Sequence, residues 1–258
     1  MPPRYDNVLI DLAGVLYQGE AAIPGAVDAL GRLRAAGCGI GFVTNTTRRT
    51  AASLVGMLTE LGFELDDSEV LTAAGAARQQ IDKDGGGAHF LVHPDLMPEL
   101  ADLASSNSGT VVVGDAGEHF TYASLNQAFR VLMAAATPRL IAMGDNRYFA
   151  DGDALSLDMG PFVQALAYAA GIEPSVVGKP AKPFFEAALH RIGAQPERTV
   201  MIGDDMASDI GGAQRAGIDG VLVRTGKYRP EDEHNTTIRP AHVADDIAAA
   251  VAWLVDRR

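Results

Sequence analysis

Short apolar runs alternate with helical segments along the chain, and this alternation constrains the fold most strongly. The runs predict strands at Val8–Leu12, Ile40–Val43, His89–Val92, Thr110–Val113, Leu140–Met143, Thr199–Ile202 and Gly220–Val223. The segments between them predict helices, among them Ala26–Ala36, Thr50–Leu61, Ser124–Ala135, Gly160–Ala170, Pro183–Ile192 and Ser208–Ala216. Strands rich in Val, Ile and Leu and separated by helices form parallel sheets covered on both faces. The expected fold class is therefore α/β, with a Rossmann-like core around a parallel sheet.

The middle of the chain, from about Thr72 to Pro174, has strands and helices of its own. The residues on either side of it carry one shared chemistry, described below. We therefore expect residues 1–72 and 175–258 to form a catalytic core, and residues 73–174 to form a smaller α/β domain inserted into it. A flexible Gly85-Gly86-Gly87 segment lies near the start of this insertion.

The composition excludes several classes of protein. A net charge of -12 argues against a nucleic-acid backbone or an anionic membrane as the main partner, although a metal and a few lysines can still create a site for an anionic substrate. The single cysteine, Cys38, permits neither an intrachain disulfide nor a cysteine-rich metal site. The sequence has no signal-peptide pattern and no membrane-spanning apolar stretch, so a cytoplasmic location is expected.

Polar residues gather where the first two predicted strands end. Asp11 closes the first strand and is followed by Gly14, which permits a tight turn with amides facing an anion. Thr44 and Asn45 close the second strand, and Thr46 follows before a helix. Hydroxyl and amide donors near a helix N-terminus favour phosphate binding, although simple N-capping is the plainer interpretation of such residues taken alone.

Two further signals come from the second half of the chain. Lys179 precedes a predicted helix, where its charge can neutralise a phosphoryl oxygen. Asp204 and Asp205 follow the strand Thr199–Ile202, and Asp209 opens the next predicted helix. Hard carboxylate oxygens at a strand end suit Mg²⁺. All these signals fall at carboxyl ends of predicted core strands or in the following loops, where open α/β sheets place their sites.

Other patterns are weaker. The glycines at 37, 39 and 41 precede a strand, whereas a dinucleotide-binding loop follows one. His89 and His93 lie four residues apart, but Pro94 and the strand pattern argue against one helical face. Arg147 and Tyr148, in the middle region, belong either to a substrate-facing segment or to a packed turn.

Together these residues resemble the haloacid dehalogenase (HAD) superfamily of phosphohydrolases. Its four motifs match Asp11–Leu16, Thr44-Asn45, Lys179 and Gly203–Asp209, and the resemblance covers nearly the whole chain. An insertion between the second and third motifs resembles subclass IIA, which has a type II α/β cap. Segments such as NQAFRVLM, VVGKP and TGKYR resemble the narrower branch of phospholysine phosphohistidine inorganic pyrophosphate phosphatases.

The resemblance implies a role for each matching residue. Asp11 attacks phosphorus and forms an aspartyl phosphate, and Thr44, Asn45, Thr46 and Lys179 bind the phosphoryl oxygens. Mg²⁺ is bound by Asp11, the backbone carbonyl of Ala13 and Asp204, while Asp205 and Asp209 support it. Arg147 and Tyr148 are candidate substrate contacts from the cap. The partner is a small phosphorylated substrate, and since the branch often dimerises through the cap, a homodimer is also expected.

Ala13 departs from the usual pattern. Most phosphatases of this superfamily have an Asp two residues after the nucleophile, which protonates the leaving group, whereas the narrower branch often has Ser. Losing a general acid–base group costs about 10²–10⁴-fold in rate. We therefore expect a preference for pyrophosphate, phosphoramidates or aryl phosphates, whose leaving groups need no proton from the enzyme. Two alternatives remain: a non-catalytic phosphate or metabolite binder with the same fold, and carbon–phosphorus cleavage.

Overall fold

The computed structural model describes residues 5–151 and 154–256. They form two compact units. The first contains residues up to Thr44, Leu54–Leu71 and the chain from Lys179 onward, and the second contains Asn45–Ser53 and Thr72–Gly178. The segment Asn45–Ser53 thus groups with the inserted region, although the sequence-based division assigned it to the core.

Six strands form the sheet of the first unit, in the order β14-β13-β12-β1-β4-β5. The strands of this unit are β1 (Asn7–Asp11), β2 (Tyr17–Gln18), β3 (Ala21–Ala22), β4 (Gly39–Thr44), β5 (Val70–Thr72), β12 (Thr199–Gly203), β13 (Asp219–Val223) and β14 (His242–Ala244). The central strand β1 pairs in parallel with β4 and with β12, and Asp11 is the register partner of Val43. The carboxyl ends of these three strands therefore meet at one edge of the sheet.

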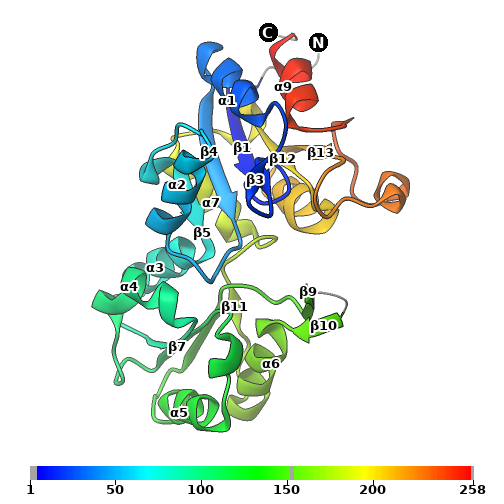
Figure 1. Cartoon of the computed structure of the whole chain (residues 1–258). Coiled ribbons are helices and arrows are strands. Elements are labelled where there is room, and N and C mark those ends of the chain that lie inside the picture. Colours follow the sequence, from blue (N-terminus) through cyan, green and yellow to red (C-terminus); the bar gives the residue numbers. More distant parts are fainter. Residues whose placement is uncertain (1–4, 152–153, 257–258) are drawn as a thin grey trace. The chain divides into compact units, whose positions relative to one another are not determined.

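Helices cover both faces of this sheet. The helices are α1 (Ala26–Ala35), α2 (Ala51–Glu60), α7 (Lys182–Arg191), a π-helical turn η6 (Met206–Gly211), α8 (Gly212–Arg215) and α9 (Ile247–Val255). Figure 1 shows α1 and α9 side by side, in agreement with the contacts between them. The parallel α/β architecture expected from the sequence is confirmed.

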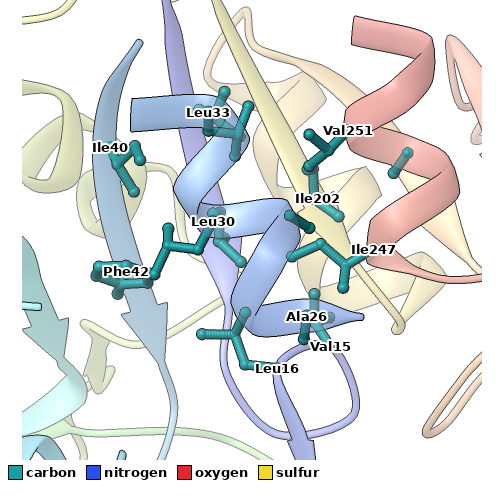
Figure 2. Close-up of a cluster of buried hydrophobic side chains, with 14 of the residues drawn as sticks. Val15, Leu16, Ala26, Leu30, Leu33, Ile40, Phe42, Ile202, Ile247 and Val251 are labelled. Atoms are coloured by element: carbon teal, nitrogen blue, oxygen red, sulfur yellow. The ribbon is translucent and has the colours of Figure 1, made fainter. Parts of the chain in front are cut away.

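The core follows from the two-residue period of the strands. Ile10 on β1 points into an apolar cluster with residues of α1, α2 and α9, and Figure 2 shows Leu30 of α1 and Ile247 of α9 in that cluster. Leu9, the neighbour of Ile10, faces the other side of the sheet, where Gly41 lies close to Ile192. Each fully buried aliphatic side chain contributes about 1.5–3 kcal/mol.

The second unit has a smaller parallel sheet in the order β11-β8-β7-β6. Its strands are β6 (His89–Leu91), β7 (Thr110–Val113), β8 (Arg139–Ala142), β9 (Tyr148–Asp151), β10 (Ala154–Leu157) and β11 (Ser175–Val176), with β9 and β10 forming an antiparallel hairpin. Its helices are α3 (Ala73–Asp84), α4 (Met97–Leu100), α5 (Tyr122–Met133) and α6 (Met159–Ala170). Figure 1 shows β7 with α5 and α6 in this unit.

One predicted helix begins differently from expectation. Asp209 does not open the helix after β12; Asp205 does, because its Oδ1 accepts hydrogen bonds from the backbone N–H groups of Ala207 and Ser208. The turns that follow are π-helical over Met206–Gly211 before α8 begins. Asp209 therefore lies inside the first turns, and its buried side chain points back toward the strand end.

In the described part of the chain, no helix combines the length and apolar character needed to cross a membrane.

Candidate active site

The loop after β1 places Asp11 at the sheet edge. Asp11 is buried, and the carbonyl oxygen of Leu12 accepts hydrogen bonds from the N–H groups of Val15, Leu16 and Tyr17, which closes a tight turn. Gly14 in this turn has a φ of 87°, in the left-handed region that favours glycine. A Cβ atom at Gly14 would also lie 2.1 Å from Oδ2 of Asp204. The glycine is therefore required by both the turn and the neighbouring carboxylate.

The strand β12 brings two more acids to the same edge. Asp204 follows Gly203, the last residue of β12, and its Oδ2 accepts a hydrogen bond of 2.7 Å from the backbone N–H of Lys227. Asp209 is nearly inaccessible, and its Oδ2 accepts a hydrogen bond of 3.1 Å from the N–H of Asp205. A Cβ atom at Gly203 would lie 2.3 Å from the Cβ of Asp209. Glycine at 203 therefore lets the Asp209 side chain pack directly against the strand end.

Lys179 joins the nucleophile candidate to Asp209. Its side chain is buried, and its Nζ atom donates hydrogen bonds of 2.6 Å to Oδ1 of Asp11 and 2.7 Å to Oδ1 of Asp209. Both bonds are charge-assisted and within the short range typical of such pairs. The cluster of Asp11, Lys179, Asp204 and Asp209 thus contains three acids and one base.

This imbalance shifts the ionisation of the acids. Burial raises the pKa of Asp204 to about 6, and repulsion from Asp209 adds to the rise. Burial likewise raises the pKa of Asp209 to about 6, against the opposing effect of Lys179. The pKa of Asp11 is raised too, mainly by burial. Burial disfavours the charged form of Lys179, but its carboxylate partners outweigh this and raise its pKa, so the lysine stays protonated.

The three carboxylates form a set of donors that fits a small hard cation. One oxygen from each of Asp11, Asp204 and Asp209 lies within 4.8 Å of the other two. Crowded, buried carboxylates repel one another, and a divalent cation removes that repulsion. Magnesium prefers oxygen ligands of this type and uses one or two carboxylates. The residues present therefore fit Mg²⁺.

The other predicted core residues have varied positions. Thr44 is buried at the end of β4, beside β1, one residue beyond the partner of Asp11. Asn45 and Thr46 are half-buried and belong to the second unit. The side chain of Ala13 is exposed. Asp205, besides capping the helix, has its Oδ2 3.6 Å from Nζ of Lys227.

The cap residues named from the sequence lie in the second unit. Arg147 is exposed and immediately precedes β9, and Tyr148 begins that strand with 54% of its surface exposed. The guanidinium carbon of Arg147 lies 5.9 Å from the centroid of the Tyr148 ring. Both side chains are therefore accessible on the β9–β10 hairpin and not packed into a turn.

Sequence reasoning gave no role in the site to the loop after β13. Thr225 donates a hydrogen bond from its hydroxyl to the backbone carbonyl of Gly14, and Lys227 binds Asp204 through its backbone. β13 ends at Val223, so the rule that sites gather at carboxyl ends of parallel strands would have selected this loop. The sequence analysis noted this segment only for the resemblance of TGKYR to the narrower branch, because none of its side chains is an acid that could act as nucleophile or metal ligand.

Comparison with known proteins identifies the family. Residues 8–104 match a model described as haloacid dehalogenase-like hydrolase, and residues 176–250 match a related HAD-hydrolase-like model. The human phospholysine phosphohistidine inorganic pyrophosphate phosphatase is 43% identical over 96% of this chain and 94% of its own length. This chain belongs to the haloacid dehalogenase-like hydrolases. The bovine haloacid dehalogenase-like hydrolase domain-containing protein 2 is 44% identical over 95% of the chain and 93% of its own length.

Solved structures place this HAD protein in subclass IIA, the subclass that the sequence resembles. A p-nitrophenyl phosphatase from Archaeoglobus fulgidus matches with a TM-score of 0.89 and 25% identity, over 98% of this chain and all of that one. NagD from E. coli K-12 matches with a TM-score of 0.84 and 26% identity, over 95% of this chain and 98% of that one. The subclass IIA resemblance and the expected enzyme class, a HAD-type phosphatase, are confirmed.

Proposed function

We propose that the chain is a Mg²⁺-dependent phosphohydrolase in which Asp11 forms an aspartyl phosphate. The observation that carries this proposal is the buried contact between Asp11 and Lys179 beside two further buried acids. A buried carboxylate beside a lysine and a cation site can attack phosphorus, because positive charge is already in place for the phosphoryl oxygens. The surrounding groups then act mainly by positioning the transferring phosphoryl group and stabilising its charge.

The reaction has two displacement steps at phosphorus. A carboxylate oxygen of Asp11 forms a bond to phosphorus, and the bond from phosphorus to the leaving group breaks, with the electron pair departing on that group. Water then attacks the phosphorus of the aspartyl phosphate, which releases inorganic phosphate and a proton and regenerates the carboxylate. Lys179, Thr44, Asn45 and Thr46 hold the phosphoryl oxygens through both steps.

Magnesium would be held by Asp11, Asp204 and the backbone carbonyl of Ala13. When bound, it supplies positive charge that screens the carboxylates from the incoming phosphoryl oxygens. Asp209 keeps Lys179 oriented through its hydrogen bond of 2.7 Å, and Asp205 holds the η6 turn that carries Asp209. These two acids therefore act on the site through their neighbours.

The substrate preference follows from Ala13. Its methyl side chain cannot donate a proton, so a leaving group must depart as a stable anion or already carry its proton. Pyrophosphate, phosphorus–nitrogen compounds and aryl phosphates meet this condition. The names of relatives support the same range, since they include a phospholysine phosphohistidine inorganic pyrophosphate phosphatase and a p-nitrophenyl phosphatase. Arg147 and Tyr148 are the cap residues that we propose as substrate contacts.

Ala13 also favours a second candidate function, a phosphate or metabolite binder without turnover. One experiment separates the two. Purified protein is incubated with p-nitrophenyl phosphate in Mg²⁺ or in chelator, beside Asp11→Asn and the control Asp28→Asn, which changes an exposed acid on α1. The enzyme proposal requires Mg²⁺-dependent release of nitrophenol that Asp11→Asn abolishes and Asp28→Asn retains. Equal background in all samples would favour the binder.

For the setting of this activity we propose a cytoplasmic homodimer formed through the cap, with neither nucleic acid nor membrane as a partner. Exposed aromatic and apolar side chains on two contacting cap helices support the dimer: Tyr122 and Met133 on α5 and Tyr168 on α6, the last with 92% of its surface exposed. Light scattering of the parent and of Tyr168→Glu tests it. A parent that is monomeric at micromolar concentration would rule the dimer out.

A further inference from the structure

The loop after β13 contacts two parts of the acidic site at once. The hydroxyl of Thr225 donates a hydrogen bond to the carbonyl oxygen of Gly14, which belongs to the turn after Asp11. Two residues later, the backbone N–H of Lys227 donates a hydrogen bond of 2.7 Å to Oδ2 of Asp204. The loop therefore joins the turn that follows the nucleophile to a carboxylate carried by a different strand.

Two glycines enclose the Asp204 carboxylate. A Cβ atom built on Gly226 would lie 1.9 Å from Oδ2 of Asp204 and 2.7 Å from the Cα of Gly14. A Cβ atom built on Gly14 would lie 2.1 Å from the same carboxylate oxygen and 3.0 Å from the Cα of Gly226. The carboxylate thus occupies a slot between two backbone segments that only residues without a side chain can form.

This slot restricts the position of the carboxylate. The backbones of Gly14 and Gly226 come so close that a Cβ atom on either would overlap Oδ2, and the N–H of Lys227 holds Oδ2 by a hydrogen bond. Fixing one oxygen also fixes the direction of the other, because the carboxylate is planar. Groups that orient a metal ligand in this way alter metal affinity without touching the metal.

We propose that Thr225, Gly226 and Lys227 form a positioning loop that holds Asp204 and the Gly14 turn in the arrangement that binds Mg²⁺. The inference rests on the proposed function, since it assigns a purpose to the same carboxylates. The inference adds residues that follow β13, beside the ends of β1 and β12, and that have no direct role in phosphoryl transfer. Thr225 and Gly226 act through Asp204 and Gly14 and are positioning residues.

The first test replaces Gly226 by alanine and compares it with Gly193→Ala. The two glycines have similar left-handed φ angles, 58° and 63°, so both changes strain the backbone to a similar degree. Among the described residues beyond its chain neighbours, none has an atom within 4 Å of the position for a Cβ on Gly193, whereas the slot leaves no room at Gly226. Calorimetric titration of Mg²⁺ into metal-free protein, without substrate, is the main measurement. We expect Gly226→Ala to weaken Mg²⁺ binding by about 10- to 100-fold, and Gly193→Ala to keep the parent affinity.

The second test uses Thr225 and does not depend on accommodating a new methyl group in the slot. Thr225→Val has nearly the same shape but no hydroxyl, and Thr225→Ser retains the hydroxyl. We expect Val to weaken Mg²⁺ binding and Ser to restore it. In steady-state assays with p-nitrophenyl phosphate, Val should raise the Mg²⁺ concentration that gives half the maximal rate, while kcat at saturating Mg²⁺ and KM change little. A loop that merely supports the fold would not produce this separation.

The outcomes distinguish this inference from the proposed function. A parent that binds no Mg²⁺ overturns both. A parent that binds Mg²⁺, with Gly226→Ala matching Gly193→Ala and Thr225→Val matching Thr225→Ser, overturns the positioning loop alone. If Gly226→Ala does not fold, the Thr225 pair decides the question.

Discussion

Lys179 lies 2.6 Å from Asp11, measured between Nζ and Oδ1, although 168 residues separate the two in the chain. The entire second unit, made of Asn45–Ser53 and Thr72–Gly178, lies between these two positions in the chain. The contact therefore depends on closure of the first unit around its sheet. Because the pair is buried, removing Lys179 leaves the Asp11 carboxylate without its counter-charge, whereas Lys179 would keep Asp209 as a partner if Asp11 were removed.

The first prediction concerns Lys179 and stability. Replacing it by methionine keeps much of its volume but leaves Asp11 and Asp209 buried without their shared cation. We expect the free energy of unfolding at pH 8 in chelator to fall by about 3–5 kcal/mol. Lys182→Met is the control, because Lys182 is exposed and its i,i+4 ion pair with Glu186 contributes at most about 0.5 kcal/mol. Urea unfolding followed by circular dichroism measures both, and equal losses would contradict the role of the buried pair.

The second prediction concerns Ala13 and the leaving group. Its side chain is exposed, so an aspartate fits there and can act as the proton donor that alanine cannot be. We expect Ala13→Asp to raise kcat/KM for alkyl phosphate monoesters by about 10²-fold or more, with a much smaller gain for p-nitrophenyl phosphate. Ala21→Asp, which adds the same charge at another exposed position, controls for net charge. Parallel changes for both substrates would argue against a missing proton donor.

The third prediction concerns pH and Asp204. Its pKa is about 6 in the folded protein against 3.8 as the ordinary value. Between these values the folded state binds the proton more tightly than the unfolded state, so stability is lost as pH rises from about 4 to about 6. Asp204→Asn cannot lose a proton, and its stability relative to the parent should therefore rise over this window. The difference should be constant above and below the window.

Denaturant unfolding in chelator at several pH values tests this third prediction. Chelator is needed because a bound cation competes with the proton. Asp28→Asn provides the control for loss of one exposed acid. A stability difference between Asp204→Asn and the parent that stays flat from pH 4 to pH 6 would contradict the raised pKa.

The fourth prediction separates two roles of Asp205. Its Oδ1 accepts two backbone hydrogen bonds that begin the η6 turn, and its charge lies near the acidic cluster. Asp205→Ala removes both the capping acceptor and the charge, and we expect the free energy of unfolding to fall by about 1 kcal/mol. Asp205→Asn keeps an acceptor of similar capping strength and should lose only a few tenths of a kcal/mol. Thermal unfolding gives the stabilities, and calorimetric Mg²⁺ titration of the same variants shows whether the charge itself contributes to binding. Equal destabilisation by Ala and Asn would contradict the capping role.

Much of the fold was predictable because buried parallel strands have a strong local pattern. Thr110–Val113 coincides with β7, and Ile40–Val43 lies within β4. The strands β2 and β14 were not predicted, since neither contains a run of strongly apolar residues. The boundary of the π-helical turn was also missed, because Asp205 and Asp209 are equally plausible caps until the hydrogen bonds are known.

The sequence by itself determined which side chains can perform the chemistry. Asp11 was recognisable because it closes a predicted strand, Asp204 and Asp209 because they come after another, and Lys179 because it precedes a predicted helix. The strand ends of a parallel sheet converge, so these residues were expected at one site. Tertiary structure alone decided how they are held. Gly226 and the N–H of Lys227 act through backbone shape and a backbone donor, which are not specified by side-chain type. Their contacts with Gly14 and Asp204 exist only because three separate strands end side by side, and that proximity appears only once the sheet has formed.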